Sequence, residues 1–97
     1  MIRISVRYLA NFAIITGRRE ETFLMPEGSS LKELLAKIVE RYGTSFMEEI
    51  FNYGSNEIKP HVLVLVNGQP LKQIGSKLDT KLFHGDSITL ALPISGG

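Results

Sequence analysis

The chain has 97 residues, enough for one small domain, and 43% of them are hydrophobic, so a packed core is expected rather than disorder. A formal net charge of +1 argues against a dedicated nucleic-acid binder, which would carry a basic stripe. The sequence contains no cysteine, and this excludes disulfides, thiolate metal sites and a cysteine nucleophile.

The N-terminal part of the chain predicts two paired strands. Residues 2–8 alternate between apolar and polar side chains, as a strand with one buried face does. Residues 9–15 lose this alternation and indicate a short turn or helical corner. Residues 21–25 form the second strand, which Pro26 ends. The chain opens without a signal-peptide core and has no stretch near the ~20 apolar residues of a membrane span, so we expect a cytoplasmic protein that acts without a membrane.

The strongest local signal predicts a helix. Ser30 and Glu33 have the spacing of a capping box, in which Ser30 is the N-cap and Glu33 reaches back from the third helical position. Apolar residues then recur at helical spacing up to Tyr42, and Gly43 is placed to end the helix. Because a sheet needs a cover, we assign this apolar stripe to the core. Residues 44–51 indicate a second, short helix.

A hairpin is predicted after the loop that follows this second helix. Residues 62–66 are a continuous β-rich run, which suits an interior strand. Asn67 and Gly68 are the favoured pair for a type I′ turn. The return strand over residues 69–71 is brief, and Pro70 confines it to an edge of the sheet.

The chain is predicted to end in a strand that delivers a short tail. A turn at Gly85 and Asp86 precedes the last strand, residues 87–92. The order of elements is β-β-α-(α)-β-β-β, without repeats. We therefore expect one domain, residues 1–92, and a flexible tail, residues 93–97.

The tail carries the candidate chemistry. Gly96 and Gly97 have no Cβ, so they can pass through a channel too narrow for side chains and present an unscreened α-carboxylate. Chain ends are often frayed, so a terminal glycine pair alone is also typical of an inert tail. The platform upstream is what favours the functional interpretation.

The element order and several motifs together resemble the ubiquitin-like β-grasp sulfur carriers, most closely the small subunit of molybdopterin synthase. The resemblance implies an α+β fold of the β-grasp type, a mixed sheet covered by one main helix with a short second helix. One departure is at Ala91 and Leu92, where these subunits commonly carry an aromatic residue and a proline. The matching motifs are Tyr8-Leu9-Ala10 with Gly17, Met25-Pro26-Glu27-Gly28 with Ser30, Glu33, Leu34 and Leu35, Val64-Leu65-Val66-Asn67-Gly68, Leu82 with Gly85-Asp86, and Pro93-Ile94-Ser95-Gly96-Gly97.

The resemblance also implies a mechanism. An E1-like adenylating enzyme would use ATP to activate the Gly97 carboxylate, and a persulfide donor would supply the sulfur of a thiocarboxylate. The molybdopterin synthase large subunit would then accept the tail, so that this chain donates sulfur without catalysing alone and without a bound cofactor. Leu9 and Leu71 match apolar contact positions, with core or edge packing as their competing interpretation. The implied partner-binding residues are Gly96, Ser95, Ile94, Pro93, Leu9 and Leu71.

Other functions stay open on the sequence. Activated Gly97 could instead be joined to a lysine of a target protein, as in a ubiquitin-like modifier. The carrier could serve thiamine synthesis or tRNA thiolation, and an inert β-grasp interaction module is a third possibility. His61 and His84 have no carboxylate cluster nearby, so no metal site is predicted.

Overall fold

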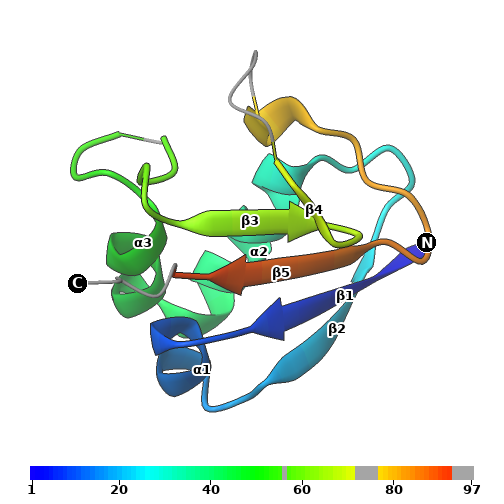
Figure 1. The fold of residues 1–97 in the computed structure, drawn as a ribbon. Helices are drawn as coiled ribbons and strands as arrows, with labels where there is room; N and C mark the ends of the chain where they lie inside the picture. Colours follow the sequence, from blue (N-terminus) through cyan, green and yellow to red (C-terminus); the bar gives the residue numbers. More distant parts are fainter. Residues whose placement is uncertain (56, 72–76, 93–97) are drawn as a thin grey trace.

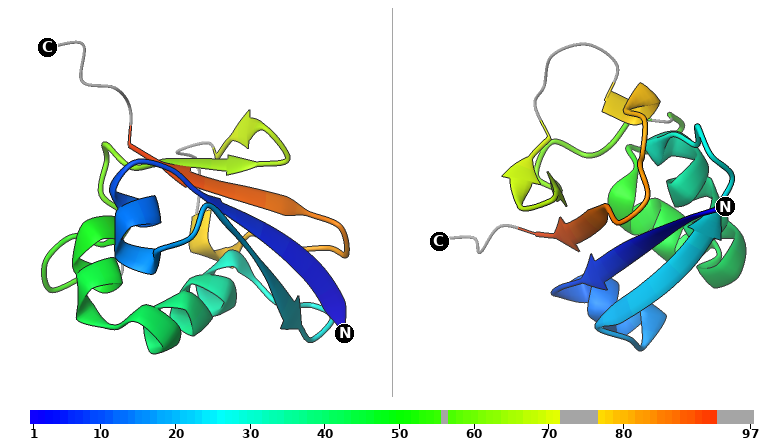
Figure 2. Two further views of the ribbon diagram at one scale, coloured as in Figure 1. Left: turned by 90° about the horizontal axis from the view of Figure 1, so that it is seen from below. Right: turned by 90° about the vertical axis from the view of Figure 1, so that its right-hand side faces the viewer.

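The structure, a computed structural model, describes residues 1–55, 57–71 and 77–92 and consists of a five-stranded sheet with its helices packed on one face (Figure 1; Figure 2). The strands are β1 (Ile2–Tyr8), β2 (Glu20–Met25), β3 (Leu63–Val66), β4 (Gln69–Pro70) and β5 (Ser87–Ala91). The helices are α1 (Asn11–Thr16), α2 (Leu31–Tyr42) and α3 (Thr44–Ile50), with a 3₁₀ turn, η1 (Lys77–Asp79).

The order of strands across the sheet is β2-β1-β5-β3-β4. The central strand, β5, runs parallel to its neighbour β1, and the other neighbouring strands run antiparallel. The first and last strands of the domain, β1 and β5, therefore pair with each other in the middle of the sheet. This arrangement confirms the predicted α+β fold, a mixed β-grasp sheet covered by one main helix.

The core lies between the sheet and α2. Alternate residues of β1 are buried, as the period-two pattern predicts, and so is the apolar stripe of α2. Each such side chain stabilises the fold by about 1.5–3 kcal/mol relative to exposure. The buried residues of these two elements are Ile2, Ile4, Val6, Tyr8, Leu31, Leu34, Leu35 and Ile38.

The predicted local signals are also confirmed. The Glu33 amide donates to Ser30 Oγ at 3.3 Å, and the Ser30 amide donates to Glu33 Oε1 at 2.9 Å, so the capping box starts α2. Asn67 and Gly68 both have positive φ, 52° and 81°, as a type I′ turn requires. The helical corner is α1, which lies between β1 and β2.

Strand β3 is interior, between β5 and β4, but it is not buried on both faces. Val64 is buried, whereas Leu63 is 37% exposed. The run of apolar residues conceals this difference, because the helices cover only one face of the sheet.

Two further classes of feature are absent from the described residues. No helix within residues 1–55, 57–71 and 77–92 is long and apolar enough to cross a membrane. The same part of the chain contains no group of three or more His, Asp or Glu side chains placed to hold a metal ion.

Candidate functional site: the end of the sheet where the tail leaves

Strand β5 ends at Ala91, and the predicted tail follows one residue later. Pro93, Ile94, Ser95, Gly96 and Gly97 lie outside the described residues. The part of the candidate site that the structure describes is therefore the surface from which the tail leaves, at the end of the sheet nearest α1 and α3 (Figure 1).

An apolar patch occupies the outer face of the sheet at this end. Leu63 pairs with Ala91 across the β3–β5 ladder. The Leu9 amide donates to the Leu90 carbonyl at 2.9 Å, which extends the β1–β5 pairing by one residue. Leu9 is 43% exposed and Leu63 37% exposed. Ala91, on the strand between them, is buried. We call Leu9, Leu63 and Ala91 the exit patch.

The two apolar residues predicted as partner contacts have different surroundings. Leu9 belongs to the exit patch and faces solvent. Leu71 is half-buried, packs against the core, and donates its amide to the Val64 carbonyl at 2.9 Å. The structure therefore makes Leu9 available to a partner and gives Leu71 a packing role. Leu63 was not among the predicted contacts, because all five residues of the run 62–66 are apolar and the sequence gives no polar partner to mark the outward side chains.

The backbone next to Leu9 is strained. Ala10 has φ 55° and ψ −133°, a conformation that residues other than glycine rarely adopt. It forms the sharp corner between β1 and α1, where the Ala13 amide donates to the Ala10 carbonyl at 3.1 Å. This corner follows Leu9, the residue after the end of β1, and turns the chain into α1.

Replacing Ala10 with glycine is expected to stabilise the protein. Strain of this kind costs on the order of 1–3 kcal/mol, and the entropy lost by an added glycine offsets about 0.5–1 kcal/mol of that, so a gain of about 1 kcal/mol is expected. Urea denaturation measures the change. The control is Ala13→Gly inside α1, which should cost about 1 kcal/mol. Equal losses in both variants would show that Ala10 stores no strain.

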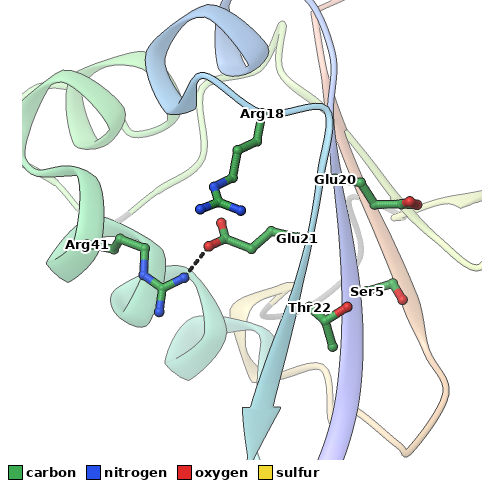
Figure 3. A pocket seen from close by; sticks show the side chains of 6 residues that line it. All are labelled: Ser5, Arg18, Glu20, Glu21, Thr22 and Arg41. Carbon is green, nitrogen blue, oxygen red and sulfur yellow. Dashed lines mark hydrogen bonds and ion pairs between the residues drawn. The ribbon is translucent and has the colours of Figure 1, made fainter.

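A polar cluster lies on the helix side of the sheet, where Glu21 of β2 points towards the helices (Figure 3). Its side chain is 4% exposed. Glu21 Oε1 accepts from the Tyr8 hydroxyl at 2.9 Å and from the Tyr42 hydroxyl at 2.7 Å, while Arg41 donates to Oε2. The cluster thus ties β1, β2 and α2 together through one carboxylate.

The hydrogen bonds keep this carboxylate ionised. Burial raises the pKa of Glu21, but the bonds from Tyr42, Tyr8 and Arg41 lower it by more, so its pKa lies below the ordinary value. Burial, and then the hydrogen bond to Glu21, raise the pKa of the Tyr8 hydroxyl. Both carboxylate oxygens are engaged, so the cluster is structural. The sequence analysis did not predict this cluster. Glu21 does alternate with Phe23 and Met25 on the inward side of the predicted strand, and a glutamate at such a position indicates a buried carboxylate that needs partners.

Comparison with known proteins places these features in context. A family model described as the ThiS family matches residues 6–97. Small archaeal modifier protein 3 of Haloferax volcanii is 24% identical over 96 residues, 99% of this chain and 100% of that protein.

Solved structures resemble the chain over its whole length. A Pyrococcus furiosus protein assigned as molybdopterin converting factor subunit 1 is 28% identical, with a TM-score of 0.74 over 97% of this chain and 100% of that one. Small archaeal modifier protein 1 of Methanosarcina acetivorans is 24% identical, with a TM-score of 0.81 over 100% of this chain and 98% of that one. The likeness to the Methanosarcina acetivorans structure shows that the two chains share a fold.

Proposed function

Because the chain belongs to the ThiS family, we propose that it is a sulfur carrier whose Gly97 carboxylate is converted to a thiocarboxylate, acting as the small subunit of a molybdopterin synthase. The observation that carries this proposal is the family match, which extends through Gly97 and so includes the glycine pair. The 28% identity to a molybdopterin converting factor subunit supports the choice of pathway.

The chemistry begins with activation, since a carboxylate at neutral pH is a poor electrophile. An E1-like enzyme transfers AMP from ATP to the Gly97 carboxylate and releases pyrophosphate. The terminal sulfur of a persulfide then attacks the acyl carbon, and AMP leaves. A thiol reduces the resulting acyl disulfide and releases the thiocarboxylate, which donates sulfur in the active site of the large subunit. The chain itself has no cysteine, so every thiol in these reaction steps comes from a partner.

We assign docking of the activating enzyme and the large subunit to the exit patch. Its exposed leucines flank the strand from which the tail leaves, so a partner that binds them also receives the tail. An apolar contact at this place would orient Gly97 without relying on the tail for affinity.

The docking role predicts that Leu63→Asp weakens binding of the adenylating enzyme about 30-fold, because burying a charge in an apolar contact costs as much as losing a hot-spot residue. Titration calorimetry with the purified enzyme measures the Kd. Leu24→Asp is the matched control, since Leu24 is 51% exposed on the same face of the sheet but belongs to β2. Equal weakening by both substitutions, or by neither, would contradict docking at the exit patch.

The function itself is tested by intact mass. The protein is weighed as recovered from its own cells, and again after incubation with ATP, the activating enzyme and a sulfur donor. The expected result is a mass gain equal to replacement of one oxygen by sulfur. If neither a thiocarboxylate nor an adduct forms under conditions in which a known carrier is converted, the protein is an inert interaction module.

A second candidate function is conjugation through Gly97 to lysines of other proteins. The likeness to small archaeal modifier protein 3 over 99% of the chain favours it. The two functions share activation and differ in the acceptor. Lysine adducts of Gly97 on cellular proteins, without a thiocarboxylate, would establish the modifier in place of the sulfur carrier. Activation followed by sulfur transfer in thiamine synthesis or tRNA thiolation would keep the carrier and change the pathway.

A further inference from the structure

The two edge strands of the sheet, β4 and β2, differ in how well another strand could pair with them. One edge is β4, which has two residues and includes Pro70, so it offers little for another strand to pair with. The other edge is β2, which runs for six residues without proline and in unbroken register with β1. Within the described residues, no strand pairs with the outer side of β2. Proteins normally blunt such an edge, so an open one points to a partner.

The register identifies which backbone groups of β2 face outward. The Tyr8 amide donates to the Arg19 carbonyl at 2.9 Å, and this pair sets the alternation along β1 and β2. The Ser5 amide, by contrast, donates towards β5, to Asp86 at 3.0 Å. Even-numbered residues of β1 therefore bond to odd-numbered residues of β2. Glu20, Thr22 and Leu24 consequently point their N–H and C=O groups away from the sheet.

Two arginines and two glutamates flank this edge. A pocket lined by Ser5, Arg18, Glu20, Glu21, Thr22 and Arg41 lies along β2, and Figure 3 shows the Arg18 and Arg41 guanidinium groups on the helix side of the strand. The Glu21 carboxylate is paired with Arg41, whose side chain is 51% exposed. The Glu20 carboxylate is paired with Arg7 on the outer face. Among the described residues, no carboxylate lies within ion-pair distance of Arg18. Both guanidinium groups therefore have donors left for an external anion.

The two sides of this edge differ in character, with an arginine over a buried ring on one and an exposed leucine on the other. The Arg41 guanidinium lies 5.2 Å from the centre of the Phe23 ring, on the helix side. Leu24 is 51% exposed on the outer face. An added strand would place alternate side chains on these two sides, with the acidic ones near the arginines and the β-branched ones near Leu24.

We propose that the outer edge of β2 binds an extended, acidic segment of a partner protein as a sixth strand. The backbone of Glu20, Thr22 and Leu24 supplies the ladder, and Arg18 and Arg41 bind carboxylates on alternate residues of the segment. This surface shares no residue with the exit patch, so the chain could hold such a partner while the exit patch is engaged elsewhere. The proposal holds whether or not Gly97 carries sulfur.

The test uses amide exchange and chemical shifts of the full chain with a defined probe. The probe is a blocked peptide of sequence Thr-Asp-Val-Asp-Val-Asp-Thr, whose acidic and β-branched residues alternate. On binding, the amides of Glu20, Thr22 and Leu24 should gain protection, while those of Glu21 and Phe23, already bonded to β1, should not change. This alternation is specific to strand addition. The same peptide with asparagine at each aspartate should bind about fivefold more weakly.

Two variants separate the backbone from the charge. Thr22→Pro removes an outward N–H that the sheet does not use and should weaken the peptide about tenfold, whereas Thr22→Val retains the N–H and should bind normally. Arg18→Gln, at an exposed position, should weaken the peptide about fivefold. Thermal unfolding of each variant verifies that it is folded.

Three outcomes would overturn the proposal. The first is the absence of a saturable response at millimolar peptide. The second is a response confined to Leu9 and Leu63, which would place the peptide on the exit patch. The third is protection of the same three amides without peptide, increasing with protein concentration, which would show that a second copy of the chain occupies the edge.

Discussion

Deletion of Gly97 is expected to abolish thiocarboxylate formation, and so are Gly97→Ala and extension of the chain by one residue. Deletion and extension move the carboxylate away from the point of attack, and alanine adds a Cβ in a channel shaped for bare backbone. A misplacement of about 1 Å costs on the order of 100-fold in rate, so no product should be detected in the time that charges the wild type. Intact mass after incubation with ATP, activating enzyme and sulfur donor measures the product.

The control for this experiment is Ser55→Ala, a substitution in the loop that follows α3. Ser55 is exposed, and its hydroxyl donates to the Asn52 carbonyl and accepts from the Glu57 amide, both in the same loop. The Ser55→Ala variant should form the thiocarboxylate at the wild-type rate. Normal charging of the Gly97→Ala or extended variant would refute the assignment of the reactive carboxylate to Gly97, while the β2-edge proposal would be unaffected.

Replacing Glu21 is expected to cause a large loss of stability. Glu21→Ala leaves the Tyr8 hydroxyl buried without its acceptor and removes the link between β2 and α2. The expected cost is about 2–4 kcal/mol, a substantial part of the ~5–15 kcal/mol that stabilises a typical domain. Urea denaturation, followed by circular dichroism, measures the free energy of unfolding.

The neighbouring glutamate is a matched control. Glu20 pairs with Arg7 at 3.9 Å on the outer face, where the two side chains are 59% and 61% exposed. Glu20→Ala should change the free energy of unfolding by about 0.5 kcal/mol or less. Similar losses for Glu20→Ala and Glu21→Ala would mean that the buried cluster contributes no more than a surface pair.

The same cluster predicts a pH dependence. Because folding lowers the pKa of Glu21, the folded state binds the proton less tightly than the unfolded state. The stability that the ionised Glu21 carboxylate adds is complete above its ordinary pKa of 4.5. It is lost as the pH falls through the lower pKa of the folded state. The stability difference between the wild type and Glu21→Gln should therefore shrink on acidification. A difference that stays constant from neutral pH into the acid range would exclude a role for the ionised carboxylate.

Much of the fold could be predicted because its signals are local. The alternation over β1, the capping box of Ser30 and Glu33, and the Asn67–Gly68 turn each depend on residues a few positions apart. Such patterns determine the conformation of a segment largely by themselves. The glycine pair of the tail is a local signal of the same kind, which is why the sequence also indicates the candidate chemistry.

The remaining features depend on residues that are distant in sequence. Tyr42 reaches Glu21 across 21 positions, and no local pattern pairs a carboxylate with donors so far along the chain. Leu63 is exposed because the helices cover only one face of the sheet, and a run of five apolar residues does not reveal which face that is. The open edge of β2 likewise depends on the order of the strands.

The sequence by itself thus determined the elements and their order, since backbone preference and side-chain periodicity act over single turns and strands, and it indicated the candidate reactive group at Gly97. Only the tertiary structure decided which surfaces those elements leave exposed. The exit patch and the β2 edge arise from the pairing of β1 with β5, which joins segments separated by most of the chain. Which residues face solvent depends on how these distant segments pack, and that packing is not contained in any one segment.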